Sequence, residues 1–437
     1  SFLSCAIVPL LVTGPFLPDL TLSLLSLWFL FFIFKNKSFY LLKNKFFYFF
    51  MVFCAFCIFS SLMSDDILFS LKSSLFYFRI GVFSLFISYL ISINKNILKH
   101  FYYTFIFTFS LLIFYAFIQY FFALQDHPYR ISSFFGDELI LGSYLSRLLP
   151  LIIALFFMRQ NKSNVENLFF LTFLVVTYFC IFITGERAAF FYINMSLLFL
   201  IFFIRFNFKI FIPIIIIIAT ITSIFIFTNT NKEFKKLLVE RYTINILSTM
   251  NLDTILNKEK KMDQLSIKKN SEYLDTFLTN QKRINKGRSE FIIFTSGHET
   301  LYRTAFNMFL DRPIIGHGPR MFRIKCSDPK YAEIVITSKH GSCMTHPHNF
   351  YIQLLAETGI IGFFFLFFLF IYISFLSIKY LYFNFVKKTK IYSDSNICIL
   401  ACLLITTWPI IPNGNFFTNY LIILYSLPVG FLKKEKI

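Results

Sequence analysis

Long blocks of apolar residues, separated by short polar stretches, run through most of the chain. A helix needs about 20 apolar residues to cross the hydrocarbon core of a bilayer. The blocks lack the two-residue alternation that strands of a membrane β-barrel require. The pattern predicts twelve spans, the first of them short. They fall at 1–11, 17–34, 46–62, 67–92, 99–123, 139–158, 165–184, 187–205, 208–228, 347–376, 395–411 and 415–432. We therefore expect an all-α polytopic membrane protein.

One connection, residues 229–345, is polar and far longer than the others. It holds 20 Lys or Arg and 12 Asp or Glu, and it separates nine predicted spans in 1–228 from three in 346–437. Residues 257–287 are rich in Lys, Asn and Gln and poor in aromatic residues. Because such a segment buries too little apolar surface to order itself, we expect this part of the connection to be mobile.

The second half of this connection has the signature of a helix. Ser296-Gly-His-Glu299 matches a capping box, in which the Ser and Glu side chains bond the first free backbone N–H groups. Glu299 and Arg303 stand four residues apart, which lets them pair on one helix face. The sequence predicts an amphipathic helix over 296–310. Its apolar face is formed by Leu301, Ala305, Met308 and Phe309.

Composition supports the membrane assignment and changes how the charge is interpreted. Hydrophobic residues make up 57% of the 437 residues and charged residues 15%, whereas soluble domains are about a quarter charged. A net charge of +19 would suggest nucleic-acid binding in a soluble protein. Lys and Arg retained on cytoplasmic loops produce the same sum, so we expect a lipid bilayer and no nucleic acid as partner.

The short loops alternate in charge and so predict an orientation. One set carries 17 Lys or Arg, and the short loops between them carry one, Arg130. The basic set consists of 35–45, 93–100, 159–166, 205–209, 377–394 and the last residues of the chain. Basic loops stay in the cytoplasm. We therefore expect both termini there, and 229–345 on the opposite face of the membrane, which is the periplasmic face if the cell is Gram-negative.

Cysteine usage fits this orientation. Six of the eight cysteines lie in predicted spans, where they act as small apolar residues. Cys326 and Cys343 lie in the long connection, and a disulfide between them is compatible with an oxidising compartment. Such a bond would close the loop directly before His346 and His348, although pairing cannot be established from sequence alone.

Three arginines lie in or beside apolar spans, where charges are costly and usually functional. Arg79 lies about 18 Å into its span and Arg147 about 12 Å, at a rise of 1.5 Å per residue. Arg187 stands at the external mouth of the eighth span. Because arginine is always charged and its fork matches phosphate, the three are candidates for binding a lipid diphosphate.

Each arginine also has a structural alternative. Arg187 can extend its side chain to lipid headgroups, and Arg147 can pair with a buried acid or with carbonyl groups. Arg79 is too deep to reach the headgroups easily, so it either pairs within the protein or lines a polar cavity. Arg130, in the loop before the sixth span, is either a contact at the lip of such a site or a solvated loop arginine.

Two histidines stand where the long connection meets the tenth span, in Thr-His-Pro-His-Asn from Thr345 to Asn349. Pro347 fits the first turn of a helix, which puts His348 at a positive helix end. That position favours a neutral imidazole, which can accept a proton near pH 7. The alternative for His348 is an interfacial histidine. His346 is expected to cap the helix and not to take part in catalysis.

The helix that follows these histidines is expected to pack closely against a neighbour. One face of a continuous helix would carry His348, Ile352, Leu355, Gly359 and Gly362. The two glycines on this face would allow a second helix to approach. Gln353 and Glu357 stand four residues apart on another face.

The pattern His348-Asn349, nine residues and then Gly359-Ile-Ile-Gly362 resembles the signature of the O-antigen ligase and Wzy-type O-antigen polymerase superfamily. Asp311-Arg-Pro-Ile-Ile-Gly-His-Gly318 and Gly185-Glu-Arg187 are also similar to that family's pattern, as are the twelve spans and the large loop. The resemblance implies a GT-C-like membrane glycosyltransferase. It would use undecaprenyl-diphosphate-linked glycans on the periplasmic face, without a metal or other cofactor.

The resemblance also implies roles for individual residues. His348 would be the base that activates an acceptor hydroxyl, and Arg187 would bind the diphosphate leaving group. Where ligases of the family commonly have Ser-Gly-Arg, this chain has Ser296-Gly-His298. A second arginine role stays open to Arg288, Arg303, Arg320 and Arg323. In all, the donor-diphosphate candidates are Arg187, Arg147, Arg79 and Arg320, and the acceptor or loop candidates are His298, Arg303, Arg288 and Arg130.

Two functions within this family differ in their acceptor, and other functions lie outside it. A ligase transfers glycan to lipid A–core and a polymerase to another lipid-linked glycan. The His298 departure favours the polymerase slightly, and a chain-length regulator is then a candidate partner. A transporter of an anionic or lipid-linked substrate, using Arg79 and Arg147, is the main alternative, but no inverted repeat supports it. A structural scaffold would leave the intramembrane arginines unexplained.

Overall fold

The computed structural model describes residues 2–125, 127, 130–159, 162–203, 296–332, 343–389 and 391–432. This part of the chain is helical and contains no β-strand. The all-α class predicted from the hydrophobic pattern is therefore confirmed for the described residues. The predicted ninth span, the segment 257–287 and Arg288 lie outside them.

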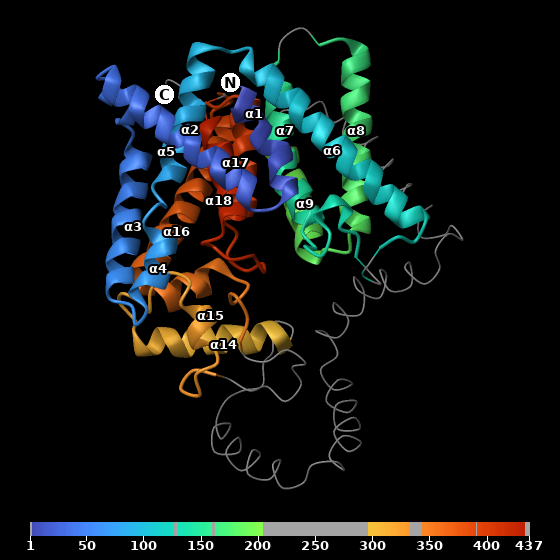
Figure 1. Ribbon diagram of the computed structural model, residues 1–437. Helices are drawn as coiled ribbons and strands as arrows, with labels where there is room; N and C mark the ends of the chain where they lie inside the picture. The colour runs from blue at the N-terminus through green and yellow to red at the C-terminus, as the bar shows by residue number, and fades with distance from the viewer. Residues whose placement is uncertain are drawn as a thin grey trace, which may run out of the picture.

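Short loops join most of the helices that are described. The α-helices are α1 (Phe2–Leu10), α2 (Phe16–Lys35), α3 (Lys45–Leu62), α4 (Ile67–Ser74), α5 (Arg79–Ile93), α6 (Ile97–Phe121), α7 (Leu141–Met158), α8 (Asn164–Ile183), α9 (Arg187–Phe203), α14 (Ser296–Asp311), α15 (Phe322–Lys325), α16 (Phe350–Leu381), α17 (Asp394–Thr406) and α18 (Asn419–Gly430). Figure 1 shows most of them in one bundle, with α14 and α15 at one end.

Seven helical segments of the described chain are long and apolar enough to cross a membrane. They are α2, α3, α4 with α5, α6, α7, α8, and α16 with the π-helical turn that follows it. Shorter apolar helices lie at α1, α9, α17 and α18. The protein is therefore a polytopic membrane protein by helix length and composition, whereas the count of twelve spans stays a prediction.

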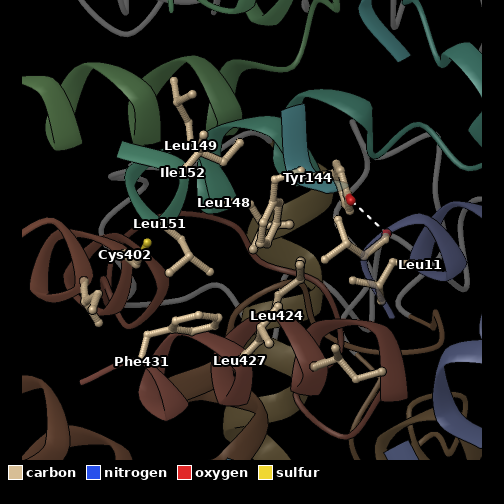
Figure 2. Packing of buried hydrophobic residues seen from close by; sticks show 14 of the residues in the cluster. Leu11, Tyr144, Leu148, Leu149, Leu151, Ile152, Cys402, Leu424, Leu427 and Phe431 are labelled. Atoms are coloured by element: carbon tan, nitrogen blue, oxygen red, sulfur yellow. Dashed lines mark hydrogen bonds between the residues drawn. The ribbon is translucent and has the colours of Figure 1, made fainter. Parts of the chain in front are cut away.

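Helix α7 forms the centre of the bundle. Every residue from Leu141 to Phe156 except Ser143 is buried, and the helix packs against α9 and α17. Figure 2 shows its leucines beside Leu424 and Leu427 of α18. A helix that is apolar on all sides belongs inside a bundle. A polar residue on α7 therefore has to find its partners within the protein.

The two ends of the bundle differ in what they carry. Figure 1 shows α14 and α15 at one end, called here the α14 end, and the N-terminal mark at the other, called the terminal end. The start of α6 and the residues after α18 meet at the terminal end, where the ring centroids of Phe101 and Phe431 are 5.0 Å apart. This geometry is compatible with the predicted orientation of the spans.

The predicted span 67–92 consists of two helices. Helix α4 ends at Ser74, a turn occupies 75–78, and α5 begins at Arg79. The Tyr77 N–H donates to the Ser74 carbonyl at 3.1 Å, a three-residue step typical of a tightened helix end. The turn contains neither Pro nor Gly, which is why the hydrophobic pattern predicts one continuous span.

The tenth span begins later than predicted. The prediction was 347–376, but α16 starts at Phe350. The Asn349 side chain accepts hydrogen bonds from two backbone N–H groups of the first turn, at 3.0 and 3.2 Å, and so caps the helix. Pro347 and His348 therefore lie outside the helix, and the expectation that Pro347 occupies its first turn is wrong.

Helix α16 is interrupted at Gly359, where φ is 64° and ψ is −164°. The loop 313–318 enters this break: its last N–H donates to the Glu357 carbonyl at 2.8 Å, and its first carbonyl accepts from the N–H after Gly359 at 2.8 Å. These bonds satisfy backbone groups that the break frees. A Cβ at Gly359 would lie 2.3 Å from the Ile314 oxygen. The predicted continuous face is wrong, because this glycine admits loop backbone instead of a second helix.

Helix α14 packs against the start of α16 (Figure 1). Its apolar face joins a small buried cluster at the α14 end. The members are Leu301, Ala305, Met308, Phe322, Cys326, Tyr331 and Ala356. Phe309, predicted for the same face, is only half-buried. Arg303 Nε donates to Glu299 Oε1 at 2.9 Å, the pair that the four-residue spacing predicts.

Candidate functional site

Three histidine rings gather at the α14 end. His298 comes from the first turn of α14, and His346 and His348 come from the loop before α16. The ring centroids of His298 and His348 are 5.5 Å apart, and those of His346 and His348 are 4.2 Å apart. His346 was expected to cap the helix, but Asn349 is the cap. The three rings are called here the histidine cluster.

The backbone around His348 is held by the loop between α17 and α18. His348 has a φ of 58°, a left-handed conformation that is uncommon for a residue with a Cβ. Its carbonyl accepts from the Asn413 N–H at 2.7 Å. Asn349 Nδ2 donates to the Pro409 carbonyl at 2.7 Å. These bonds fix the histidine segment just before the helix start.

Burial favours the neutral form of the three imidazoles in the histidine cluster. Desolvation lowers the pKa of His298 to about 4, helped by the charges of His348 and Arg187. Desolvation and the His348 charge lower the pKa of His346 to about 3. The pKa of His348 is also lowered by burial. All three imidazoles are therefore neutral near pH 7, and each ring can accept a proton.

Arg187 brings a positive charge to the same end of the bundle. It is the first residue of α9, and it follows Gly185, whose φ is 69°. Its charge is close enough to contribute to the lowered pKa of His298. The start of α9 thus lies close enough to the start of α14 for an electrostatic effect, although the two segments are far apart in the sequence.

Arg147 lies on the central helix α7 and is held by neutral groups. Only 2% of the residue is exposed. Its Nη2 donates to Asn413 Oδ1 at 2.6 Å and to the Tyr192 hydroxyl at 3.1 Å, and its Nε donates to Ser143 Oγ at 3.1 Å. The guanidinium also lies 4.4 Å from the Tyr192 ring centroid. Since the Asn413 N–H bonds the His348 carbonyl, one residue links Arg147 to the histidine segment.

Glu186 organises the start of α7. Its Oε1 accepts from the Gly142 N–H at 2.7 Å and its Oε2 from the Ser143 N–H at 3.1 Å. A carboxylate is favourable at a helix N-terminus. Burial raises the pKa of this carboxyl to about 7, against the lowering effect of Arg130 and the two backbone bonds. The acid in the Gly-Glu-Arg motif therefore positions the helix that carries Arg147.

Arg79, by contrast, forms an ion pair with Asp19 of α2. Its Nη2 lies 2.5 Å from Asp19 Oδ1, and its Nη1 donates to Ser23 Oγ at 2.7 Å. These contacts account for a charge inside an apolar span. Of the two alternatives for Arg79, the structure favours pairing within the protein.

Three further arginine candidates also have partners. Arg130 Nη2 donates to the Leu139 carbonyl at 2.5 Å and lies 3.8 Å from Glu186. Arg320 lies near α4, with its Nη1 3.4 Å from Ser73 Oγ. Arg303 pairs with Glu299, as described above. Arg288 lies outside the described residues. Arg323, the remaining candidate, is close enough to the histidine cluster for its charge to help lower the pKa of His346.

A buried polar network lies behind the histidine cluster. Gln353 Nε2 donates to Glu357 Oε2 at 2.9 Å and to Asn415 Oδ1 at 2.8 Å. Glu357 Oε1 accepts from the Phe322 N–H at 3.1 Å. The four-residue spacing of Gln353 and Glu357 is visible in the sequence, whereas the contacts of Asn413 and Asn415 were not predicted. The sequence signal for these two residues is the Pro-Asn-Gly-Asn run, which separates two apolar blocks.

Cys326 and Cys343 form a disulfide in the structure, with their Cα atoms 4.8 Å apart. Cys326 belongs to the small buried cluster under α14, and Cys343 begins the described segment that leads to His346. The bond therefore anchors the histidine segment at the end opposite to its Asn349 cap. Within the described part of the chain, no three His, Cys, Asp or Glu side chains are grouped to hold a metal ion.

Comparison with known families supports the resemblance seen in the motifs. Residues 169–367 match the sequence model of the family described as O-antigen ligase. The chain is therefore similar to the O-antigen ligase family over this segment. The match includes Arg187, His298 and His348, whereas Arg147 and Asn413 lie outside it. No curated protein matches the chain.

Proposed function

We propose that this protein is a membrane glycosyltransferase of the O-antigen ligase or polymerase type. It transfers a glycan from an undecaprenyl-diphosphate carrier to a hydroxyl of an acceptor sugar, on the periplasmic face of the inner membrane. The family match over 169–367 supports the class of activity. The observation that carries the proposal is a neutral His348 beside His298, whose pKa the charge of Arg187 helps to lower.

The reaction needs a base on one side of the anomeric carbon and a stabilised leaving group on the other. The acceptor O–H transfers its proton to the neutral His348 as the acceptor oxygen bonds to the anomeric carbon. The bond from that carbon to the diphosphate oxygen breaks, and its electron pair leaves with the diphosphate. Attack opposite to the leaving group inverts the configuration. Fixed protein cations can stabilise the departing charge, so we propose a metal-independent reaction.

We assign the diphosphate to Arg187 and Arg147. Buried Nη1 of Arg147 has no hydrogen-bond partner among the described residues, which leaves one donor for a phosphate oxygen. The other nitrogen atoms of this guanidinium are fixed by Asn413, Tyr192 and Ser143. His298 stands where ligases commonly carry arginine, and we propose that its neutral N–H donates to the phosphate or to the acceptor.

The transporter alternative has less support. An anion pathway through the spans would use Arg79 and Arg147 together, but Arg79 is paired with Asp19 and Ser23. Arg147 is bound to a separate network at the start of α7. The two charges therefore do not form one pathway through the contacts described.

The acceptor is proposed to be another lipid-linked glycan, which makes the protein a polymerase in preference to a lipid A–core ligase. The support is the histidine in place of the usual ligase arginine. A polymerase would act together with a chain-length regulator. A strain that lacks the polymerase carries single repeats on its lipid A–core. If long lipid-linked chains accumulate in the deletion strain instead, the protein is a ligase.

The proposed function can be tested by reconstitution with an undecaprenyl-diphosphate-linked glycan. We expect His348→Ala and Arg187→Ala each to lower transfer by about a hundredfold or more. Matched controls are His100→Ala and Arg159→Ala, which lie on α6 and after α7, far from the cluster in sequence. EDTA should leave transfer unchanged. Wild-type transfer by His348→Ala would remove the base assignment, and strong inhibition by EDTA would contradict metal independence.

A further inference from the structure

A second site for a ligand lies in the bundle, apart from the histidine cluster. A cavity of about 750 Å³ lies between α3, α5, α16, α17 and α18. Cavities of this size hold a single ligand in other proteins. Its walls are mainly apolar and aromatic, including Phe47, Phe50, Leu366, Leu369 and Ile373. None of the arginines or histidines assigned to glycan transfer lines it.

The charged lining of this cavity lies at its terminal end. Lys43 and Lys45 line it there, together with Asn396 and Ser88. They are the only charged residues of the lining, and within the described residues neither lysine has an ion-pair partner. Two uncancelled positive charges thus stand at the mouth of an apolar cavity.

The start of α3 adds to this positive charge. Lys45 is the first residue of the helix, and its first turn has no acidic residue. A lysine at a helix N-terminus is unfavourable next to the positive end of the helix dipole. An anion bound at this mouth would relieve that repulsion. The charge and the apolar walls together match a molecule with an anionic head and a hydrocarbon tail.

We propose that this cavity binds an anionic phospholipid. Its phosphate contacts Lys43 and Lys45, and an acyl chain fills the apolar cavity toward Phe350, which lines the far end. Anionic headgroups attract lysines placed at the membrane surface. The lipid comes from the leaflet at the terminal end, which the loop charges predict to be the cytoplasmic leaflet. This lipid is separate from the donor, whose diphosphate is assigned to the α14 end.

The proposal is tested by measuring binding of phosphatidylglycerol and phosphatidylcholine to the full chain in detergent by native mass spectrometry. We expect wild-type protein to retain phosphatidylglycerol, and Lys43→Gln/Lys45→Gln to bind it about tenfold more weakly. The matched control is Lys35→Gln/Lys37→Gln, in the same basic loop but outside the cavity, and it should bind as wild type does. Leu369→Trp, which fills the cavity and keeps both lysines, should also lose the lipid.

Two outcomes would overturn the proposal. Equal binding of the two phospholipids by wild-type protein would mean that charge does not select the occupant. Retention of a polyprenyl diphosphate, unchanged by Lys43→Gln/Lys45→Gln and lost in Leu369→Trp, would mean that a polyprenyl lipid fills the cavity instead of an anionic phospholipid. Because lipid retention is measured without an acceptor, neither outcome depends on whether the proposed glycan transfer is correct.

Discussion

Arg79 and Arg147 both lie within apolar spans, yet the structure gives them different surroundings. Arg79 is paired with Asp19 at 2.5 Å, and about a quarter of each side chain is exposed, 23% and 24%. Arg147 is buried and held by the neutral oxygens of Asn413, Tyr192 and Ser143. One charge is cancelled by its partner, and the other is not cancelled by any ion pair among the described residues.

This difference indicates how to separate a structural arginine from a functional one. A charge in an ion pair is satisfied without a ligand, and its cost is offset when the protein folds. A charge held only by neutral groups is not compensated by an opposite charge, so it still attracts an anion. The second arrangement suits an anionic substrate, because its charge is then used in binding.

The largest expected effect is the difference in glycan transfer between two variants, each of which removes one of the two arginines. Arg147→Leu should lower glycan transfer by about a hundredfold or more, since one fixed donor to the departing diphosphate is lost. Arg79→Leu should keep transfer within a few-fold of wild type, because the charge of Arg79 forms an ion pair with Asp19 and is not used to bind the donor. Both are measured by reconstituted turnover. Similar losses in the two variants would remove the distinction between the two regions.

The second test leaves Arg79 without its partner. Asp19→Asn should lower the free energy of unfolding by about 1–3 kcal/mol, less than for a fully buried pair because both side chains are partly exposed. The measurement is thermal or denaturant unfolding in detergent. Asp19→Asn/Arg79→Met should regain much of this loss. An unchanged stability in Asp19→Asn would mean that the pair is not structural.

The third test makes the Arg147 region resemble the Arg79 region. Asn413→Asp places a carboxylate on the guanidinium and keeps the backbone bond to His348. We expect transfer to fall by about tenfold, because the new charge repels diphosphate and cancels part of the field of Arg147. Asn413→Ala is the matched control for loss of the side-chain contact alone. A rate in Asn413→Asp above that of Asn413→Ala would contradict this account.

The smallest effect concerns the pH dependence of stability at the histidine cluster. Folded His298 and His346 have pKa values lowered to about 4 and about 3 from an ordinary 6.5. The unfolded chain therefore binds more protons between pH 6.5 and 4, so stability is present above pH 6.5 and is lost as pH falls. His298→Gln should reduce this loss, and the control His100→Gln should not. An identical slope in wild type and His298→Gln would contradict the buried, neutral cluster.

Several elements could be predicted from the sequence because their signals are local. The capping box and apolar spacing at 296–310 predict a helix where α14 lies. The apolar blocks predict all-α structure because helices satisfy their own backbone bonds inside a bilayer. The break in α16 could not be predicted in this way. It depends on the loop 313–318, whose backbone reaches Gly359 only in the folded chain.

The candidate site shows the same division. His348, Arg187 and the departure at His298 were visible as residues, because a charge or an imidazole beside an apolar block stands out. The role of Asn413 was not visible, since an asparagine in a short loop is ordinary until Arg147 and the His348 carbonyl are placed against it. His346 was assigned to a cap because the helix start was predicted three residues too early.

The sequence by itself determined the helical class, the alternating basic loops and the set of charges available inside the spans. These follow from transfer free energies and backbone bonding, which act on each segment separately. The tertiary structure decided which arginine was paired with a carboxylate and which was held by neutral side chains. It also decided where α16 breaks and which loops meet the histidine segment. Such choices depend on contacts between distant segments, and a hydrophobic pattern carries no record of those contacts.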